Sequence, residues 1–269
     1  MKNRKSKTDK HQSGIRQYAS GRLYSFIQSV SKYRPDAFQG KPARCLPDRI
    51  FLQAMNILVC AATNKELSPL LQHQQQLLQA TDIDILITGI GLTATTYHLT
   101  RYLSMKKPGL VIQAGVGGCF DNRVQLGSVL AISQETIADE SVVELKSLKS
   151  LFDLKLVPQN QFPYKKGWLV NPHKDYLEKT KLKVVKGISV NEITTSKQKI
   201  EFYKHAFSPV VESMEGAALH YTCLMENIPF VQIRSVSNYI AERNKQKWNM
   251  QDSIINLNNE LVKLLSSLA

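Results

Sequence analysis

Four groups of chemically capable residues fall at points where an α/β protein places its ligands. Glu66 follows the first strongly apolar run of the chain, and the glycine-rich stretch at 115–118 follows another. Ser213-Met214-Glu215 and Ser237-Asn238 come after or within two further apolar runs. Open α/β sheets bind ligands just beyond the carboxyl ends of their strands. The spacing therefore predicts one pocket that holds two carboxylates, backbone N–H donors and a side-chain amide.

Each of these groups also has an ordinary structural explanation. A glutamate early in a helix, as Glu66 is expected to be, is favoured there by the helix dipole and commonly points into solvent. Glu215 is also typical of a capping acid, Asn238 of a turn, and glycines of any tight connection after a strand. A pocket is therefore indicated by the four groups together and by none of them alone.

The elements that must position these groups alternate between short apolar runs and helical patterns from residue 55 onward. This alternation predicts an α/β fold with strands buried on both faces. The expected strands are 57–61, 83–88, 110–114, 128–133, 184–190, 209–212 and 230–236. The expected helices are 64–79, 93–105, 196–203, 214–226 and 250–268, with 134–143 irregular or extended and 157–182 an insertion or lid followed by a short helix. We expect one domain from 55 to 269.

Composition excludes several classes of protein. The 269 residues are 43% hydrophobic and 21% charged, which is typical of a soluble chain with a large core. No apolar run approaches the roughly 18 residues of a transmembrane helix. The four cysteines form no CxxC pair and the six histidines no HExxH pair, so neither a disulfide framework nor a bound metal is predicted. We expect a reduced, cytoplasmic protein.

The net charge of +13 is concentrated near the N-terminus. Residues 1–54 hold 12 Lys and Arg against 3 acids, a net of +9, and the remainder has a net of only +4. Such a leader is compatible with a nucleic-acid-binding arm, a membrane-surface segment or an organelle transit peptide. The interpretation we favour is a disordered basic extension, or a start codon assigned too far upstream. Neither nucleic-acid nor membrane binding is the favoured function.

Four motifs resemble those of the nucleoside phosphorylase and nucleosidase superfamily. They are MNILVCAATNKEL at 55–67, QAGVGGCF at 113–120, VESMEGAA at 211–218 and VQIRSVSN at 231–238. The resemblance covers nearly all of residues 55–269 and leaves 1–54 unmatched. It implies a single three-layer α/β/α domain with a mixed central sheet, no cofactor, and a homo-oligomeric assembly.

Within that superfamily, the segment SNYIAERNKQKWN at 237–249 is most similar to futalosine hydrolases of the alternative menaquinone pathway. Those enzymes release hypoxanthine from futalosine. The resemblance therefore implies a small-molecule nucleoside substrate and hydrolysis of its N-glycosidic bond.

The resemblance also implies roles for individual residues. Glu66 would activate the attacking water as general base, Glu215 would accept hydrogen bonds from ribose hydroxyls, and Asn238 would face the base. Met214 would pack under the sugar, Ile193 and Thr194 would line the base, and Arg243, with Trp248 as an aromatic wall, would hold the benzoate of futalosine. Backbone N–H groups near the water or ribose would come from Gly115, Val116 and Gly117.

Two features separate the alternatives inside the superfamily. A phosphate nucleophile needs fixed cationic donors, and the segments around Glu66 and 115–118 contain no arginine and only Lys65 beside an acid. Asn238 stands where the branch that cleaves 6-aminopurine nucleosides carries an aspartate; an amide cannot protonate N7 but can donate to N7 or O6. Hydrolysis of a 6-oxopurine nucleoside is favoured. A methylthioadenosine/S-adenosylhomocysteine-type nucleosidase is the runner-up, followed by a purine nucleoside phosphorylase and a nucleoside-binding protein without activity.

Overall fold

Strands that are apolar on both sides form the centre of the protein. The computed structural model describes residues 56–73, 82–144, 146–241, 246 and 248–268. The chain divides into two units, 1–51 and 52–269, and every described residue belongs to the second. The predicted extension at 1–54 lies outside the described residues. All five residues of strand β1 (Ile57–Ala61) are buried, as predicted for a strand covered on both faces.

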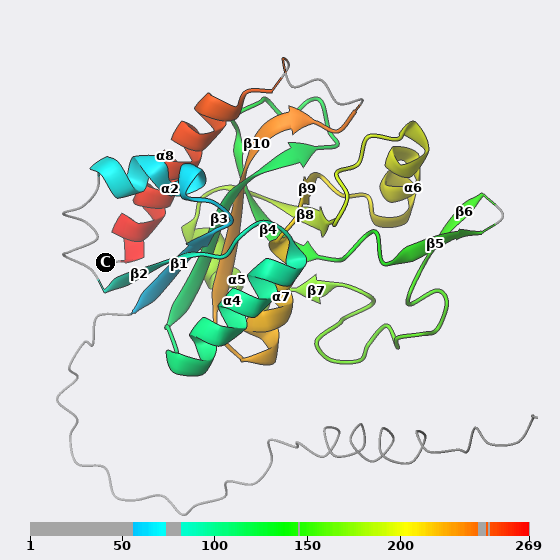
Figure 1. Cartoon of the computed structure of the whole chain (residues 1–269), viewed down its shortest axis with the longest axis horizontal. Helices are drawn as coiled ribbons and strands as arrows, with labels where there is room; N and C mark the ends of the chain where they lie inside the picture. The colour runs from blue at the N-terminus through cyan, green and yellow to red at the C-terminus, as the bar shows by residue number, and fades with distance from the viewer. Residues whose placement is uncertain (1–55, 74–81, 145, 242–245, 247, 269) are drawn as a thin grey trace, which may run out of the picture. The chain divides into compact units, whose positions relative to one another are not determined.

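The main sheet contains eight strands and mixes parallel with antiparallel pairs (Figure 1). Its order is β10-β4-β8-β9-β3-β1-β2, with β7 paired to β4. Because β10 also pairs with β3, the strands β3, β10, β4, β8 and β9 close into a ring, and β1 and β2 extend it. The bounds are β2 Ile83–Ile87, β3 Leu110–Cys119, β4 Val129–Glu135, β7 Leu169–Val170, β8 Lys183–Ser189, β9 Val211–Ser213 and β10 Phe230–Tyr239.

Helices cover both faces of this sheet. On one face α2 (Asn64–His73) and α8 (Met250–Leu268) pack together against Val59 and Ile112. On the other, α4 (Leu92–Met105) and α7 (Gly216–Met225) pack against Leu58 and Cys60. Successive side chains of β1 thus pack against helices on opposite faces of the sheet, as the two-residue repeat of a strand requires. The predicted three-layer α/β/α domain with a mixed sheet is confirmed (Figure 1).

The glycine-rich stretch was expected to break its strand after Ala114, and this prediction is wrong. Strand β3 continues to Cys119 because both of its edges remain paired there. Gly117 lies opposite Val236 of β10, and Gly118 lies between Asn238 of β10 and Glu212 of β9. The glycines therefore form part of the sheet, not a loop above it.

The remaining differences from the prediction are local. The stretch predicted as irregular or extended at 134–143 leads into a separate hairpin of β5 (Ser141–Glu144) and β6 (Ser147–Ser150). The predicted short helix after the insertion is α5 (Lys174–Lys179), and the helix predicted from 196 is α6 (Lys197–Phe207). The helix predicted over 64–79 is described only to His73. None of the helices in the described ranges is long and apolar enough to cross a membrane.

A buried carboxyl group joins the sheet to the start of α7. Glu135 of β4 accepts hydrogen bonds from Gln232 Nε2 of β10 at 2.9 Å and from Ser189 Oγ of β8 at 3.1 Å. Ser189 Oγ in turn accepts the Ala217 N–H at 2.8 Å, in the first turn of α7. Burial raises the pKa of Glu135 to about 7, although the hydrogen bond from Gln232 opposes the rise. The start of α7, which follows Glu215 directly, is therefore connected by hydrogen bonds to a carboxyl group that titrates near neutral pH.

Glu135→Gln is expected to flatten the pH dependence of stability. A carboxyl whose pKa is higher in the folded state stabilises most below its unfolded pKa, and that contribution is lost as pH rises through about 7. Between pH 4.5 and 8 the wild type should lose about 3 kcal/mol of unfolding free energy relative to the variant. Urea unfolding at a series of pH values measures this, with exposed Glu178→Gln as the matched control. Parallel curves for wild type and Glu135→Gln would contradict the expectation.

Candidate active site

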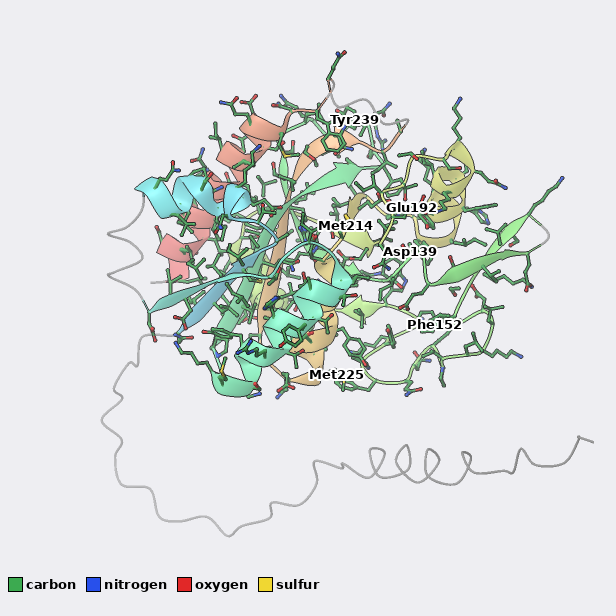
Figure 2. The ribbon with its side chains drawn as sticks, in the orientation of Figure 1. Asp139, Phe152, Glu192, Met214, Met225 and Tyr239 are labelled. Atoms are coloured by element: carbon green, nitrogen blue, oxygen red, sulfur yellow. The ribbon has the colours of Figure 1, made fainter. Side chains whose placement is uncertain are left out.

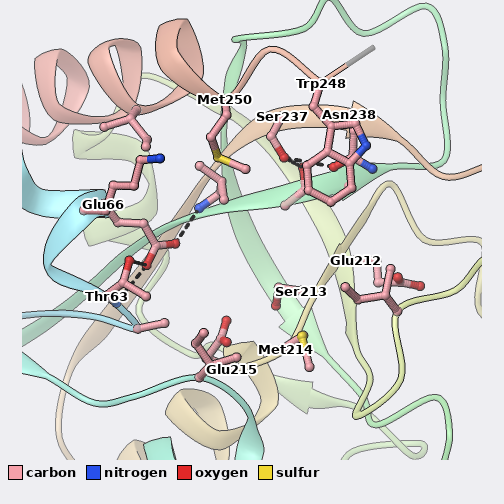
Figure 3. Close-up of a pocket in the computed structure, with 18 of the residues that line it drawn as sticks. Thr63, Glu66, Glu212, Ser213, Met214, Glu215, Ser237, Asn238, Trp248 and Met250 are labelled. Atoms are coloured by element: carbon pink, nitrogen blue, oxygen red, sulfur yellow. Dashed lines mark hydrogen bonds between the residues drawn. The ribbon is translucent and has the colours of Figure 1, made fainter. Parts of the chain in front are cut away.

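A cavity of about 350 Å³ lies where the carboxyl ends of β1, β3 and β10 meet the starts of α2 and α7 (Figure 3). All four residue groups predicted to share a pocket contribute to its wall. The lining residues are Ala62, Thr63, Lys65, Glu66, Ile90, Val116, Gly117, Gly118, Ile193, Glu212, Ser213, Met214, Glu215, Ser237, Asn238, Ile240, Trp248, Met250 and Ile254.

Glu66 is held from two sides and is 7% exposed. Its Oε2 accepts hydrogen bonds from the N–H and the hydroxyl of Thr63, each at 3.0 Å, in the manner of a helix capping box. Its Oε1 accepts the Val116 N–H of β3 at 3.1 Å, which ties α2 to the central strand. Burial raises the pKa of Glu66 above its ordinary value, and the positive charge of Arg234 opposes the rise. Glu66 is therefore not the solvated first-turn acid of the ordinary explanation.

Glu215 binds a loop on one side and a buried cation on the other. Its Oε1 accepts the Gly91 N–H at 3.0 Å, at the start of α4, and its Oε2 lies 3.4 Å from Nη1 of Arg234. Arg234 is 1% exposed and also donates from Nη2 to Gln113 Oε1 at 2.6 Å. One guanidinium thus positions Glu215 and limits the rise in the pKa of Glu66.

Gly115 makes room for this cation. A Cβ atom at position 115 would lie 2.1 Å from Nη1 of Arg234 and 3.0 Å from Oε1 of Glu66, so a larger residue would displace the guanidinium. The residue does not line the cavity, although its N–H had been predicted to reach the ligand. The glycine serves the close approach of Arg234 to the strand.

Asn238 enters the cavity beside a β-bulge. The register of β10 on β3 shifts between Val236 and Asn238, so that both Ser237 and Asn238 line the cavity. The Ser237 hydroxyl donates to Asn238 Oδ1 at 2.9 Å, and Asn238 Nδ2 donates to the Tyr239 carbonyl at 3.2 Å. The amide is thereby oriented with its carbonyl toward Ser237.

Other predicted residues are placed as follows. Val116, Gly117, Ile193, Met214 and Trp248 line the cavity. Thr194 does not line it but donates its N–H to Glu212 at 3.0 Å. Arg243, the predicted benzoate ligand, lies outside the described residues.

Three features of the site were not predicted: the buried Arg234 beside the cavity, Lys65 as a lining residue and Glu212 as a third lining carboxylate. Arg234 could have been suspected, because a charged residue inside the apolar run 230–236 must be paired if it is buried. Lys65 is the one cation among the described lining residues, whereas Glu66, Glu212 and Glu215 are acidic. Glu212 gave no signal in the sequence beyond its place beside the Met-Glu pair. In the described part of the chain no group of three or more acidic, Cys or His side chains could hold a metal.

Comparison with known proteins identifies the family of this chain. The model of the phosphorylase superfamily matches residues 74–268, a range that contains Glu215, Arg234 and Asn238. The chain belongs to the phosphorylase superfamily. Glu66 precedes the matched range, and the fold brings it to the cavity by the contacts described above.

Similar proteins within this superfamily are nucleosidases. The chain is 24% identical over 170 residues to a 5′-methylthioadenosine/S-adenosylhomocysteine nucleosidase of Maridesulfovibrio salexigens, which covers 61% of this chain and 71% of the relative. It is 23% identical over 192 residues to the futalosine hydrolase of Thermus thermophilus, with 70% and 84% covered. The structure of a methylthioadenosine/S-adenosylhomocysteine nucleosidase of Colwellia psychrerythraea with adenine has the same fold, with a TM-score of 0.67, 20% identity and coverage of 80% and 96%. These relatives support an N-glycosidic nucleoside hydrolase.

Replacing the buried cation should move the pH profile of the site. In Arg234→Gln the carboxyl of Glu66 loses the charge that opposes the rise in its pKa, so the acid limb of kcat/KM should move to higher pH. The matched control is Arg123→Gln, because Arg123 is a surface arginine paired with Asp121. The measurement is kcat/KM for nucleoside cleavage from pH 4 to 9, with thermal melting to verify folding. A folded variant with an unmoved acid limb would show that Arg234 does not act on Glu66.

Proposed function

We propose that this protein hydrolyses the N-glycosidic bond of a 6-oxopurine nucleoside, with futalosine as the substrate and hypoxanthine as the released base. The observation that carries the proposal is the pairing of two buried carboxylates, Glu66 and Glu215, with an amide, Asn238, in one cavity. The similarity to the Thermus thermophilus futalosine hydrolase supports it.

The carboxylates suit the cationic character of the reaction. Departure of the base leaves an oxocarbenium-like sugar, which nearby negative charge stabilises. In the proposed reaction Glu66 takes a proton from a water molecule as its oxygen bonds to C1′ of the ribose. Glu215 accepts hydrogen bonds from ribose hydroxyls, and Met214 packs against the sugar. A raised pKa brings Glu66 closer to the range in which a general base works best at neutral pH.

Asn238 determines how the base leaves. As the C1′–N9 bond breaks, its electron pair passes to the purine. The Asn238 NH₂ group can donate to N7 or O6 but cannot protonate N7 at neutral pH. A 6-oxopurine can place much of this charge on O6, and the released base then takes a proton from solvent. A 6-aminopurine has no such oxygen, which disfavours methylthioadenosine and S-adenosylhomocysteine.

Water fits the cavity better than phosphate does as the nucleophile. No arginine is among the described residues that line it, and Lys65 lies beside Glu66 in the chain. Arg234 is close, but its guanidinium is already bonded to Glu215 and Gln113. An incoming phosphate would meet carboxylates without a cationic fork to bind it.

The benzoate of futalosine needs a cation, which we assign to Arg243 or Lys65. Lys65 lines the cavity, and Arg243 follows β10 by four residues in the chain. We also propose a cytoplasmic location and a homo-oligomeric assembly. Both rest on the resemblance to the superfamily and on the cysteine pattern of the sequence.

The proposal predicts selective base release in the absence of phosphate. Purified protein should release hypoxanthine from futalosine, with much slower release from inosine, which lacks the benzoate, and from methylthioadenosine or S-adenosylhomocysteine. Chromatography of the free bases in phosphate-free buffer measures all four substrates in parallel. Adenine as the main product would favour the methylthioadenosine/S-adenosylhomocysteine activity instead. Release only after addition of phosphate would identify a phosphorylase.

Glu66→Gln tests the general base. The amide can still accept a hydrogen bond from Thr63 or Val116, so folding should be retained, but it cannot take a proton from water. We expect kcat to fall about 10²- to 10⁴-fold with little change in the affinity for hypoxanthine. Glu201→Gln, an exposed change on α6, serves as control. Turnover close to that of the wild type would remove Glu66 from the mechanism.

A further inference from the structure

A buried amide on α8 bonds the helix that carries Glu66. Asn258 of α8 is 2% exposed. Its Nδ2 donates to the main-chain carbonyl of Glu66 at 2.8 Å, and its Oδ1 accepts the Leu70 N–H of α2 at 3.2 Å. The same Nδ2 donates to the Ile254 carbonyl, one turn earlier in α8, at 2.7 Å. The oxygen and the nitrogen of this amide are therefore both bonded to the backbone of α2.

The two backbone groups that Asn258 bonds are partners in the hydrogen-bond ladder of an α-helix. Such a helix joins each carbonyl to the N–H four residues later, and Glu66 and Leu70 are four residues apart. The amide thus spans one rung of α2 from outside the helix. The main chain of Glu66 is located by α8 as well as by its own helix.

The first turns of α2 are short of a backbone donor. Pro69 lies inside the helix and has no N–H to give to the Lys65 carbonyl. The Ser68 hydroxyl donates to that carbonyl instead, at 3.0 Å. A proline in a helix interior removes one ladder bond and crowds the carbonyl of the preceding turn. The neighbouring rung, between residues 66 and 70, therefore gains more from outside support than it would in a helix without proline.

The start of α8 is fixed to β10, which makes the helix a firm support. The buried Ser253 hydroxyl donates to the Val236 carbonyl at 2.9 Å, and the Asn249 N–H donates to the Ser237 carbonyl at 2.8 Å. Ser253 and Asn258 are separated by about 7.5 Å along the helix. The helices α2 and α8 lie side by side over a shared core (Figure 2). The position of α2 relative to β10 is therefore fixed through Asn258.

We propose that Asn258 is a positioning residue for Glu66, which holds its carboxylate where it can take a proton from the attacking water. The inference rests on the proposed function, because it takes Glu66 as the general base. Hydrogen bonds from Thr63 and Val116 orient the carboxylate, whereas those of Asn258 locate the main chain that carries it. Asn258 does not line the cavity, so it acts through Glu66 and not by contact with a ligand. Misplacement of a reacting group by about 1 Å can cost about 100-fold in rate.

Asn258→Leu replaces the amide by an apolar group of the same branched shape. The Glu66 carbonyl and the Leu70 N–H can then bond each other as in a regular helix, so the variant should fold. We expect kcat for nucleoside cleavage to fall about 10- to 100-fold, with KM changed by less than about threefold. The control is Asn256→Leu, which removes an α8 amide that bonds the Gly127 carbonyl at 3.0 Å. The substrate is futalosine, or methylthioadenosine if base release shows that it is the nucleoside cleaved, and thermal melting verifies folding.

A double variant separates the positioning of Glu66 from a general structural effect. If Asn258 acts through Glu66, adding Asn258→Leu to Glu66→Gln should slow the reaction by less than about threefold, since the group that Asn258 positions is already lost. A distorted cavity would slow the residual reaction of Glu66→Gln as much as it slows the wild type. That result would overturn the inference, as would a folded Asn258→Leu with the kcat of the wild type. If Asn258→Leu does not fold, Asn258→Ala removes the same bonds without a larger side chain and replaces it in the cycle.

The outcomes keep the two proposals apart. If Glu66→Gln retains the turnover of the wild type, the general-base assignment and this inference fall together. If Glu66→Gln is impaired and Asn258→Leu is not, only the role of Asn258 is overturned. A loss in Asn258→Leu that disappears in the Glu66→Gln background supports positioning by Asn258, whichever purine nucleoside is cleaved.

Discussion

The guanidinium of Arg234, buried behind the cavity, is the group on which the positions and charges of the site carboxylates depend. Arg234 lies in the buried part of strand β10, where an unpaired charge would be prohibitively costly. Its hydrogen bonds to Glu215 and Gln113 join β10 to β3 and to the start of α7. Removing one partner of such a buried pair leaves the other charge buried and unpaired, which is strongly destabilising. The positions of the carboxylates and the stability of the central strands therefore depend on the same contact.

The charge of Arg234 also limits the rise in the pKa of Glu66. Burial alone raises the pKa of Glu66, and with the nearby charge of Glu215 it would favour the neutral acid. Arg234 opposes this, as do hydrogen bonds from Val116 and Thr63. In its proposed role as general base, Glu66 must be ionised at neutral pH and still be able to accept a proton, and these opposed influences suit both requirements. Glycine at position 115 is the steric condition for the arrangement.

The fold could be predicted from the sequence wherever local pattern determines structure. Alternating apolar runs gave the strands and their two covered faces, and the ends of those strands located the cavity. What could not be predicted depends on partners distant in the chain. The continuation of β3 through its glycines requires β9 and β10, which lie about a hundred residues away. Likewise, no local pattern reveals that the Glu212 carboxylate accepts a hydrogen bond from Thr194 or that Arg234 lies against Gly115.

The bulge in β10 explains how the Asn238 amide is held at one end of the cavity. In a regular strand Ser237 and Asn238 would face opposite sides, and the serine could not hold the amide. The shifted register brings both to the cavity, where the Ser237 hydroxyl donates to the Asn238 carbonyl oxygen and the Asn238 NH₂ group donates to the Tyr239 carbonyl. A fixed donor that cannot release its proton stabilises negative charge without neutralising it. In the proposed reaction this arrangement suits a leaving base that can carry the negative charge itself, which is the link between the bulge and the proposed 6-oxopurine substrate.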